Sequence, residues 1–70
     1  MSFESINTAM LEIYDELKDN KDAEDIIEGI DKAQSDMQLR MHVKRALVLI
    51  AKNNKDLADS IKEKLQGWLL

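Results

Sequence analysis

The residue types on which enzyme active sites depend are scarce in this chain of 70 residues. His42 is the only histidine and cysteine is absent, so the chain offers no thiol nucleophile and only one imidazole to activate another group. Gly29 and Gly67 stand alone, so neither belongs to a glycine-rich phosphate loop. We therefore predict no catalytic residues, no cofactor and no small-molecule substrate. We expect His42 to be structural or, alternatively, to contact a partner protein.

Carboxylates four residues apart recur in the first half of the chain, for example Glu12 with Glu16 and Glu24 with Glu28. On a helix, this spacing places both side chains on one face, where they could bind a hard cation or stay solvated. No calcium-loop pattern and no second histidine accompanies them, so we predict no metal site. We predict instead a solvated acidic face, formed by Glu12, Asp15, Glu16, Asp19, Glu24, Asp25 and Glu28.

Arg40, Lys44 and Arg45 form a basic cluster in the second half of the chain. Small helical bundles often present one basic helix to a nucleic-acid groove, so a nucleic-acid-binding regulator is one interpretation. The net charge of −4 counts against it, and the pair Asn53-Asn54 does not fit a helix-turn-helix pattern. We therefore do not expect nucleic acid as a partner.

The two halves of the chain carry opposite charge. Residues 1–36 hold eleven acidic side chains and three lysines, whereas residues 37–70 hold three acidic and seven basic side chains. We expect the acidic half to pack beside the basic half, with solvated ion pairs that contribute little each. The alternative is an inhibitor of the phage or plasmid type, whose carboxylates mimic nucleic acid and occupy a basic groove of another protein.

The elements that position these side chains are all predicted to be helices, because the chain has no proline and no strand-like alternation. The first helix begins near Ser2 or Ser5 and ends near Lys18. Asp22 is expected to cap the second helix, in which Gly29 would mark a close approach of a neighbouring helix or, alternatively, be a tolerated surface glycine. The apolar seam of the first helix comprises Phe3, Ile6, Met10, Ile13 and Leu17, and that of the second Ile26, Ile30, Ala33 and Met37.

A break is predicted where this seam changes phase, between Met37 and Leu39. Ser35 and Gln38 have the spacing of a capping box, so a third helix begins at Ser35 or Asp36 and ends near Lys52. One continuous helix from residue 22 to 52 is the alternative. Asn53 would then stop the third helix in a left-handed conformation and Asn54 would follow as a cap. The remaining apolar positions are Leu39, Val43, Ala46 and Ile50 in the third helix, and Leu57, Ile61, Leu65 and Trp68 in the fourth.

The sequence thus predicts an all-α fold: a small antiparallel bundle of four short helices, or three if the second and third are continuous. Residues 1–70 would form a single helical domain. No stretch approaches the length of a membrane span and there is no signal-like start, so we expect no membrane contact and a cytoplasmic location.

Large apolar residues are too numerous for the core of so small a bundle, which favours binding to another chain. We predict that the protein is not an enzyme but a protein-binding module, of the regulator, inhibitor or chaperone kind. It would act through a hydrophobic helix surface edged by charge, and a homodimer is the expected form. The apolar tail is expected to dock on the bundle or on a partner. The predicted partner-binding residues are Leu11, Tyr14, Met41, Val48, Leu49, Trp68 and Leu69. The alternative is that a loosely packed core of this chain absorbs all of them.

Overall fold

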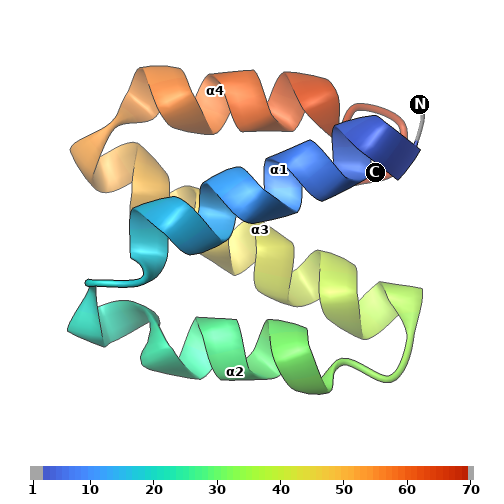
Figure 1. The fold of residues 1–70 in the computed structure, drawn as a ribbon, viewed down its shortest axis with the longest axis horizontal. Helices are drawn as coiled ribbons and strands as arrows, with labels where there is room; N and C mark the ends of the chain where they lie inside the picture. The colour runs from blue at the N-terminus through green and yellow to red at the C-terminus, as the bar shows by residue number, and fades with distance from the viewer. Residues whose placement is uncertain (1–2, 70) are drawn as a thin grey trace.

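Four α-helices and one short 3-10 helix build the fold in the computed structural model, which describes residues 3–69 and, of Phe3, the backbone alone. Consecutive helices run in opposite directions, so the predicted all-α antiparallel bundle is confirmed (Figure 1). The suggested cap at Ser2, the side chain of Phe3 and the last residue, Leu70, lie outside the described residues. The elements are α1 Phe3–Leu17, η1 Lys21–Ala23, α2 Glu24–Lys32, α3 Asp36–Asn53 and α4 Lys55–Lys64.

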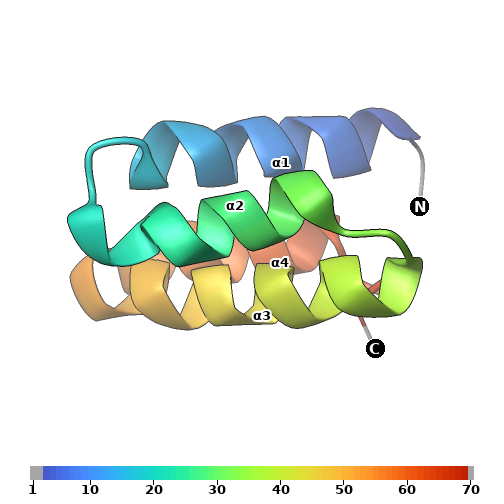
Figure 2. The same ribbon diagram turned by 90° about the horizontal axis from the view of Figure 1, so that it is seen from below.

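The helix α3 is the central element, because it contacts each of the other three helices. Figure 2 shows α1 and α3 on opposite sides of the bundle, with α2 and α4 between them. One side of α3 packs on these neighbours, and its opposite side faces away from them. None of the helices within residues 3–69 is long and apolar enough to cross a membrane.

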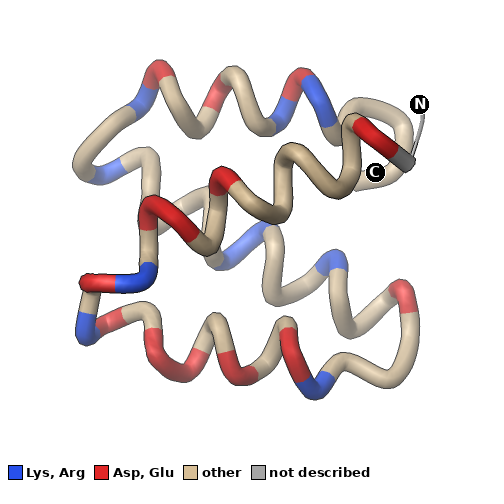
Figure 3. The backbone as a smooth tube through the Cα atoms, viewed as in Figure 1, with Lys and Arg blue, Asp and Glu red and all other residues tan. Residues whose placement is uncertain are grey.

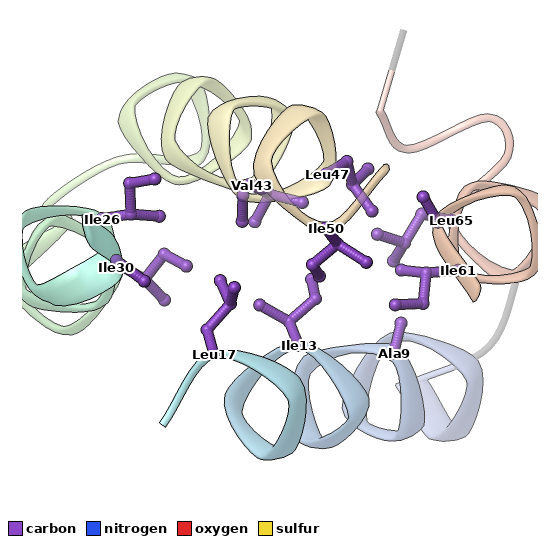
Figure 4. Close-up of a cluster of buried hydrophobic side chains, with 13 residues drawn as sticks. Ala9, Ile13, Leu17, Ile26, Ile30, Val43, Leu47, Ile50, Ile61 and Leu65 are labelled. Atoms are coloured by element: carbon purple, nitrogen blue, oxygen red, sulfur yellow. The ribbon is translucent and has the colours of Figure 1, made fainter. Parts of the chain in front are cut away.

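The core lies between the four helices and is made of aliphatic side chains (Figure 4). Most predicted seam positions are buried, including Ile13 on α1, Ile50 on α3 and Ile61 on α4. One large core residue, Leu47, is absent from the predicted seams although it is only 1% exposed. Its burial follows from the central place of α3, which is covered by α2 on one side and by α4 on the other and so buries a wider face than one seam. Three buried alanines were missed as well: Ala9, Ala23 and Ala58.

Ser35 separates α2 from α3, so the alternative of one continuous helix is wrong. The Ser35 side chain accepts a hydrogen bond from the Gln38 backbone N–H at 3.2 Å. The Gln38 side chain reaches back and accepts from the backbone N–H of Gln34 at 2.9 Å, one residue before the position that a capping box uses. These two contacts satisfy backbone donors at the break, which stabilises a new helix start there.

The start of α2 differs from the prediction, because Asn20 and not Asp22 provides the cap. The side-chain oxygen of Asn20 accepts from the backbone N–H of Asp22 at 2.9 Å, and the 3-10 turn η1 then leads into α2. The backbone N–H groups that need a cap are therefore those at the start of η1. Ala23, the residue before α2, has no side chain that could accept a hydrogen bond.

A single residue, Asn54, connects α3 to α4. Its backbone N–H donates to the carbonyl of Ile50 at 2.8 Å, which ends α3, and its side chain accepts from the N–H of Leu57 at 3.1 Å, which caps α4. The predicted cap is confirmed. The predicted left-handed stop at Asn53 is wrong, because no non-glycine residue from 3 to 69 has a positive φ and Asn54 turns the chain with a φ of −151°.

Met37 does not belong to the core, which differs from its predicted place in the apolar seam of the second helix. It is 78% exposed, because α2 ends at Lys32 and Met37 lies in the first turn of the separate helix α3. The new helix starts in another phase, which turns Met37 away from the bundle.

The C-terminal tail docks on the bundle. The regular helix α4 ends at Lys64, earlier than predicted, and Gly67 follows with a positive φ of 93° that glycine adopts without steric cost. Trp68 and Leu69 are half-buried and pack against the core cluster. The tail therefore closes the end of the core in this chain.

Candidate protein-binding surface

The seven predicted partner-binding residues do not form one surface. Four of them are half-buried and pack against the core: Tyr14, Leu49, Trp68 and Leu69. The other three are exposed, Leu11 at 69%, Met41 at 53% and Val48 at 64%. Leu11 lies on α1 and the other two on α3, and these helices are on opposite sides of the bundle (Figure 2). Two separate surfaces therefore remain as candidates.

Trp68 is held by a member of the predicted basic cluster. The guanidinium carbon of Arg40 lies 5.5 Å from the centroid of the Trp68 ring, which is the distance of a cation–π contact. Arg40 is half-buried, and its Nε is buried without a hydrogen-bond partner. Its position thus fixes the C-terminal tail to α3, and the cluster that faces solvent is reduced to Lys44 and Arg45, both exposed.

Tyr14 links α1 to the end of α2. Its hydroxyl donates to Oδ1 of Asp31 at 2.6 Å. The pKa of Tyr14 is raised to about 12, mainly by burial and also by the hydrogen bond to Asp31 and the negative charge of Asp31. The phenol is therefore neutral at physiological pH and serves as a donor inside the chain.

The first candidate surface is a groove between α1 and α2. It has a volume of about 510 Å³ and is lined by Leu11, Tyr14, Asp15, Lys18 and Ile27. Its floor is mainly apolar, and its rim carries an ion pair in which Lys18 lies 3.1 Å from Asp15. Both rim side chains are mostly exposed, so this pair contributes little to stability.

The second candidate surface is the outer side of α3. Met37, Met41 and Val48 are separated by four and seven residues, so they form a row along one side of the helix that is about 16 Å long. Lys44 and Arg45 lie on either side of this row, and Lys52 lies at its end. The only acidic residue of α3 is Asp36, in its first turn. We call this set, Met37, Met41, Lys44, Arg45, Val48 and Lys52, the α3 stripe.

The acidic half packs beside the basic half as expected, but the ion pairs between them are few. Among the ion pairs of residues 3–69, only one joins the two halves, and it links Nζ of Lys64 on α4 to Oε1 of Glu12 on α1. The other three are local pairs between residues three or four positions apart. The side of α3 that faces the neighbouring helices is apolar, and Lys44 and Arg45 are exposed and form none of these ion pairs.

The predicted acidic face is largely exposed. Glu12 is the exception, because it is half-buried and paired with Lys64. The other six predicted members are exposed, and Figure 3 shows acidic residues from the second half of α1 through the turn and along α2. No group of three or more histidine, aspartate or glutamate side chains within residues 3–69 is arranged to hold a metal ion.

His42 is half-buried and packs on Gly29 of α2. A Cβ atom added to Gly29 would lie 2.5 Å from Cε1 of the His42 ring, so only glycine leaves room for the ring in this position. The predicted close approach at Gly29 is confirmed, and the ring of His42 is what approaches it.

Sequence reasoning missed two residues of the α3 stripe, Met37 and Lys52, and Met37 is the apolar one. The signal that could have found it is the helix start at Ser35, since counting from that start places Met37, Met41 and Val48 on one side. Comparisons of the chain with protein families, with curated proteins and with solved structures gave no match.

Proposed function

We propose that this chain is a small protein-binding module of the regulator, inhibitor or chaperone kind, and that it binds its partner through the α3 stripe. The observation that carries the proposal is the row of Met37, Met41 and Val48, which are 78%, 53% and 64% exposed on one side of the longest helix. The lack of cysteine suits a reducing compartment, so a cytoplasmic location is part of the proposal.

The physical reason is that these three side chains contribute little to folding in water. If a partner covered them fully, each would contribute on the order of 1.5–3 kcal/mol. Two of the three are methionines, which adapt to an irregular partner surface because their side chains are unbranched and polarizable. Apolar residues spaced along one side of a helix are also the pattern by which helices are recognised in grooves.

The test is capture of partners from an extract of the organism that encodes the chain. We expect Val48→Asp to lose the captured protein, because it places a carboxylate in the middle of the apolar row. The matched control is Leu11→Asp, which makes the same kind of change at an equally exposed apolar residue on α1 and should keep the partner. Circular dichroism must show that both variants fold. Capture by Val48→Asp equal to that of the wild type would refute the proposal.

The acidic face supports a second candidate function, an acidic inhibitor that occupies a basic surface of another protein. The observation that favours it is that most carboxylates of α1, the turn and α2 are exposed. Figure 3 shows these acidic residues along consecutive segments of the chain, with some lysines among them. Asp19→Lys with Asp25→Lys should then lose a partner that Val48→Asp retains. If the charge-reversed variant keeps every captured protein, the acidic face is a solvated surface only.

A further inference from the structure

We propose that the partner segment on the α3 stripe is an amphipathic helix with acidic residues along both edges of its apolar side. This inference rests on the proposed function and adds the chemistry of the partner. It starts from the charges of the stripe, since Lys44, Arg45 and Lys52 have no carboxylate in salt-bridge contact within residues 3–69.

The stripe has a regular arrangement of charge around its apolar row. Lys44 lies along one edge of the row and Arg45 along the other. A helix that packs its own apolar residues against Met41 and Val48 would bring residues three and four positions away over these edges. Carboxylates at such positions would meet Lys44 and Arg45, whereas lysines there would be repelled. The row is about 16 Å long, which corresponds to about three helical turns of the partner.

A second copy of this chain fits the stripe poorly. Symmetric pairing of two α3 helices would place Lys44 and Arg45 against the same residues of the other copy, which is a like-charge contact. The acidic helix α2 offers no apolar row either, because Ile26 and Ile30 are each only 6% exposed. Among the large apolar residues of the described chain, Leu11 alone is exposed outside the stripe.

An anionic membrane shares the negative charge of the proposed helix but fits the stripe less well. The stripe has no aromatic residue, and the chain as a whole carries a net charge of −4, which such a membrane repels. A helix avoids most of this repulsion because it contacts only α3. The membrane is therefore an outcome of the test and not the proposal.

The experiment uses three synthetic peptides of about 14 residues that share one leucine face and carry glutamate, glutamine or lysine along both edges. Each peptide is titrated into isotope-labelled protein and followed by NMR. We expect the glutamate peptide to shift the methyl signals of Met37, Met41 and Val48. It should bind on the order of tenfold more tightly than the glutamine peptide, lose part of that advantage in salt, and bind far more tightly than the lysine peptide.

A charge-reversed variant makes the test specific. Lys44→Glu with Arg45→Glu should invert the order and prefer the lysine peptide. The control is Lys21→Glu with Lys62→Glu, which makes the same change in net charge at two exposed lysines that lie on η1 and α4, outside the stripe. It should bind as the wild type does.

Several results would overturn the inference. Equal binding of all three peptides at the stripe would keep the protein-binding function and refute the acidic partner. Tighter binding to phosphatidylglycerol vesicles than to the glutamate peptide would point to a membrane. Shifts confined to the groove beside Leu11, or no binding of any peptide, would also refute it, while capture from extract would still decide the proposed function separately.

Discussion

At the scale of single residues, the contact between Gly29 and His42 shows how a locally unfavourable residue can suit the fold. Glycine inside a helix costs about 1 kcal/mol relative to alanine. In α2 this cost is offset by the packing of the His42 ring, which occupies the space where a side chain would begin. Gly29 therefore lowers the intrinsic stability of α2 as a helix but allows α2 and α3 to pack closely.

We expect the effect of Gly29→Ala to depend on His42. In a His42→Ala background the ring is absent, and Gly29→Ala should raise the free energy of unfolding by about 1 kcal/mol. In the wild type the gain should be smaller or negative, because the new methyl group must displace the ring. Urea denaturation of the four proteins in this cycle measures the difference. Equal effects in both backgrounds would show that the ring moves away at no cost.

Because of the Tyr14 hydroxyl, we expect the free energy of unfolding to fall as the pH rises in the alkaline range. Its pKa is raised from 10.0 to about 12 in the folded chain, so the stabilisation is fully present below pH 10 and declines as the pH rises towards 12. Tyr14→Phe loses the hydrogen bond to Asp31, which should cost about 1 kcal/mol at neutral pH. The difference between the two proteins should shrink above pH 10, as measured by urea denaturation. A difference that stays constant would exclude this role of the phenol.

At the scale of elements, neighbouring residues of α3 can lie on opposite sides of the helix, one in the core and the next in solvent. Leu47 is 1% exposed and Val48 is 64% exposed. We expect Leu47→Asp to unfold the chain, because it buries a charge in the core, and Leu47→Ala to cost about 2–5 kcal/mol. Val48→Asp should change the free energy of unfolding by less than about 0.5 kcal/mol. Circular dichroism during thermal unfolding distinguishes these outcomes, and unfolding by Val48→Asp would mean that its side is covered.

The helices could be predicted well from the sequence, because their caps and apolar spacing are local signals. Ser35 located the break between α2 and α3, and Asn54 located the start of α4. The faces were harder to predict, since a seam shows which residues are apolar but not how many neighbours a helix has. Leu47 was missed for this reason, and Met37 was misplaced because the phase changes at the break.

The candidate surface was predicted in part. Met41 and Val48 were named as partner-binding residues and are exposed, but Tyr14 and Trp68 have contacts inside the chain that no sequence pattern announces. A hydroxyl that reaches Asp31, or a ring that lies on Arg40, depends on how helices pack across the bundle. Such contacts between distant residues are set by tertiary structure, and only the structure shows them.

At the scale of the whole molecule, opposite charges lie on different sides instead of neutralising each other. Acidic residues run along the second half of α1, the turn and α2 (Figure 3). Lys44 and Arg45 are exposed on α3. A molecule with separated charges attracts partners of both signs to different surfaces. It also constrains how copies of the chain can meet.

The homodimer stays a prediction, and light scattering at several concentrations tests it. Because like charges disfavour pairing through the α3 stripe, we expect any dimer to use the groove between α1 and α2. Leu11→Asp should then dissociate it, and Val48→Asp should leave it intact. A monomer at all concentrations would contradict the predicted homodimer. Dissociation by Val48→Asp alone would show that the α3 stripe is the dimer interface.

The one-residue connection at Asn54 has a consequence for the order of folding. A connection this short costs little chain entropy to close, and α3 and α4 are adjacent in the sequence, so their contacts can form early. The contacts of α1 with α3 and α4 span most of the chain and should form later. We expect Ile50→Val and Ile61→Val to slow folding with φ-values above about 0.5, and Ile13→Val mainly to speed unfolding. Stopped-flow kinetics would show the reverse pattern if α1 belonged to the folding nucleus.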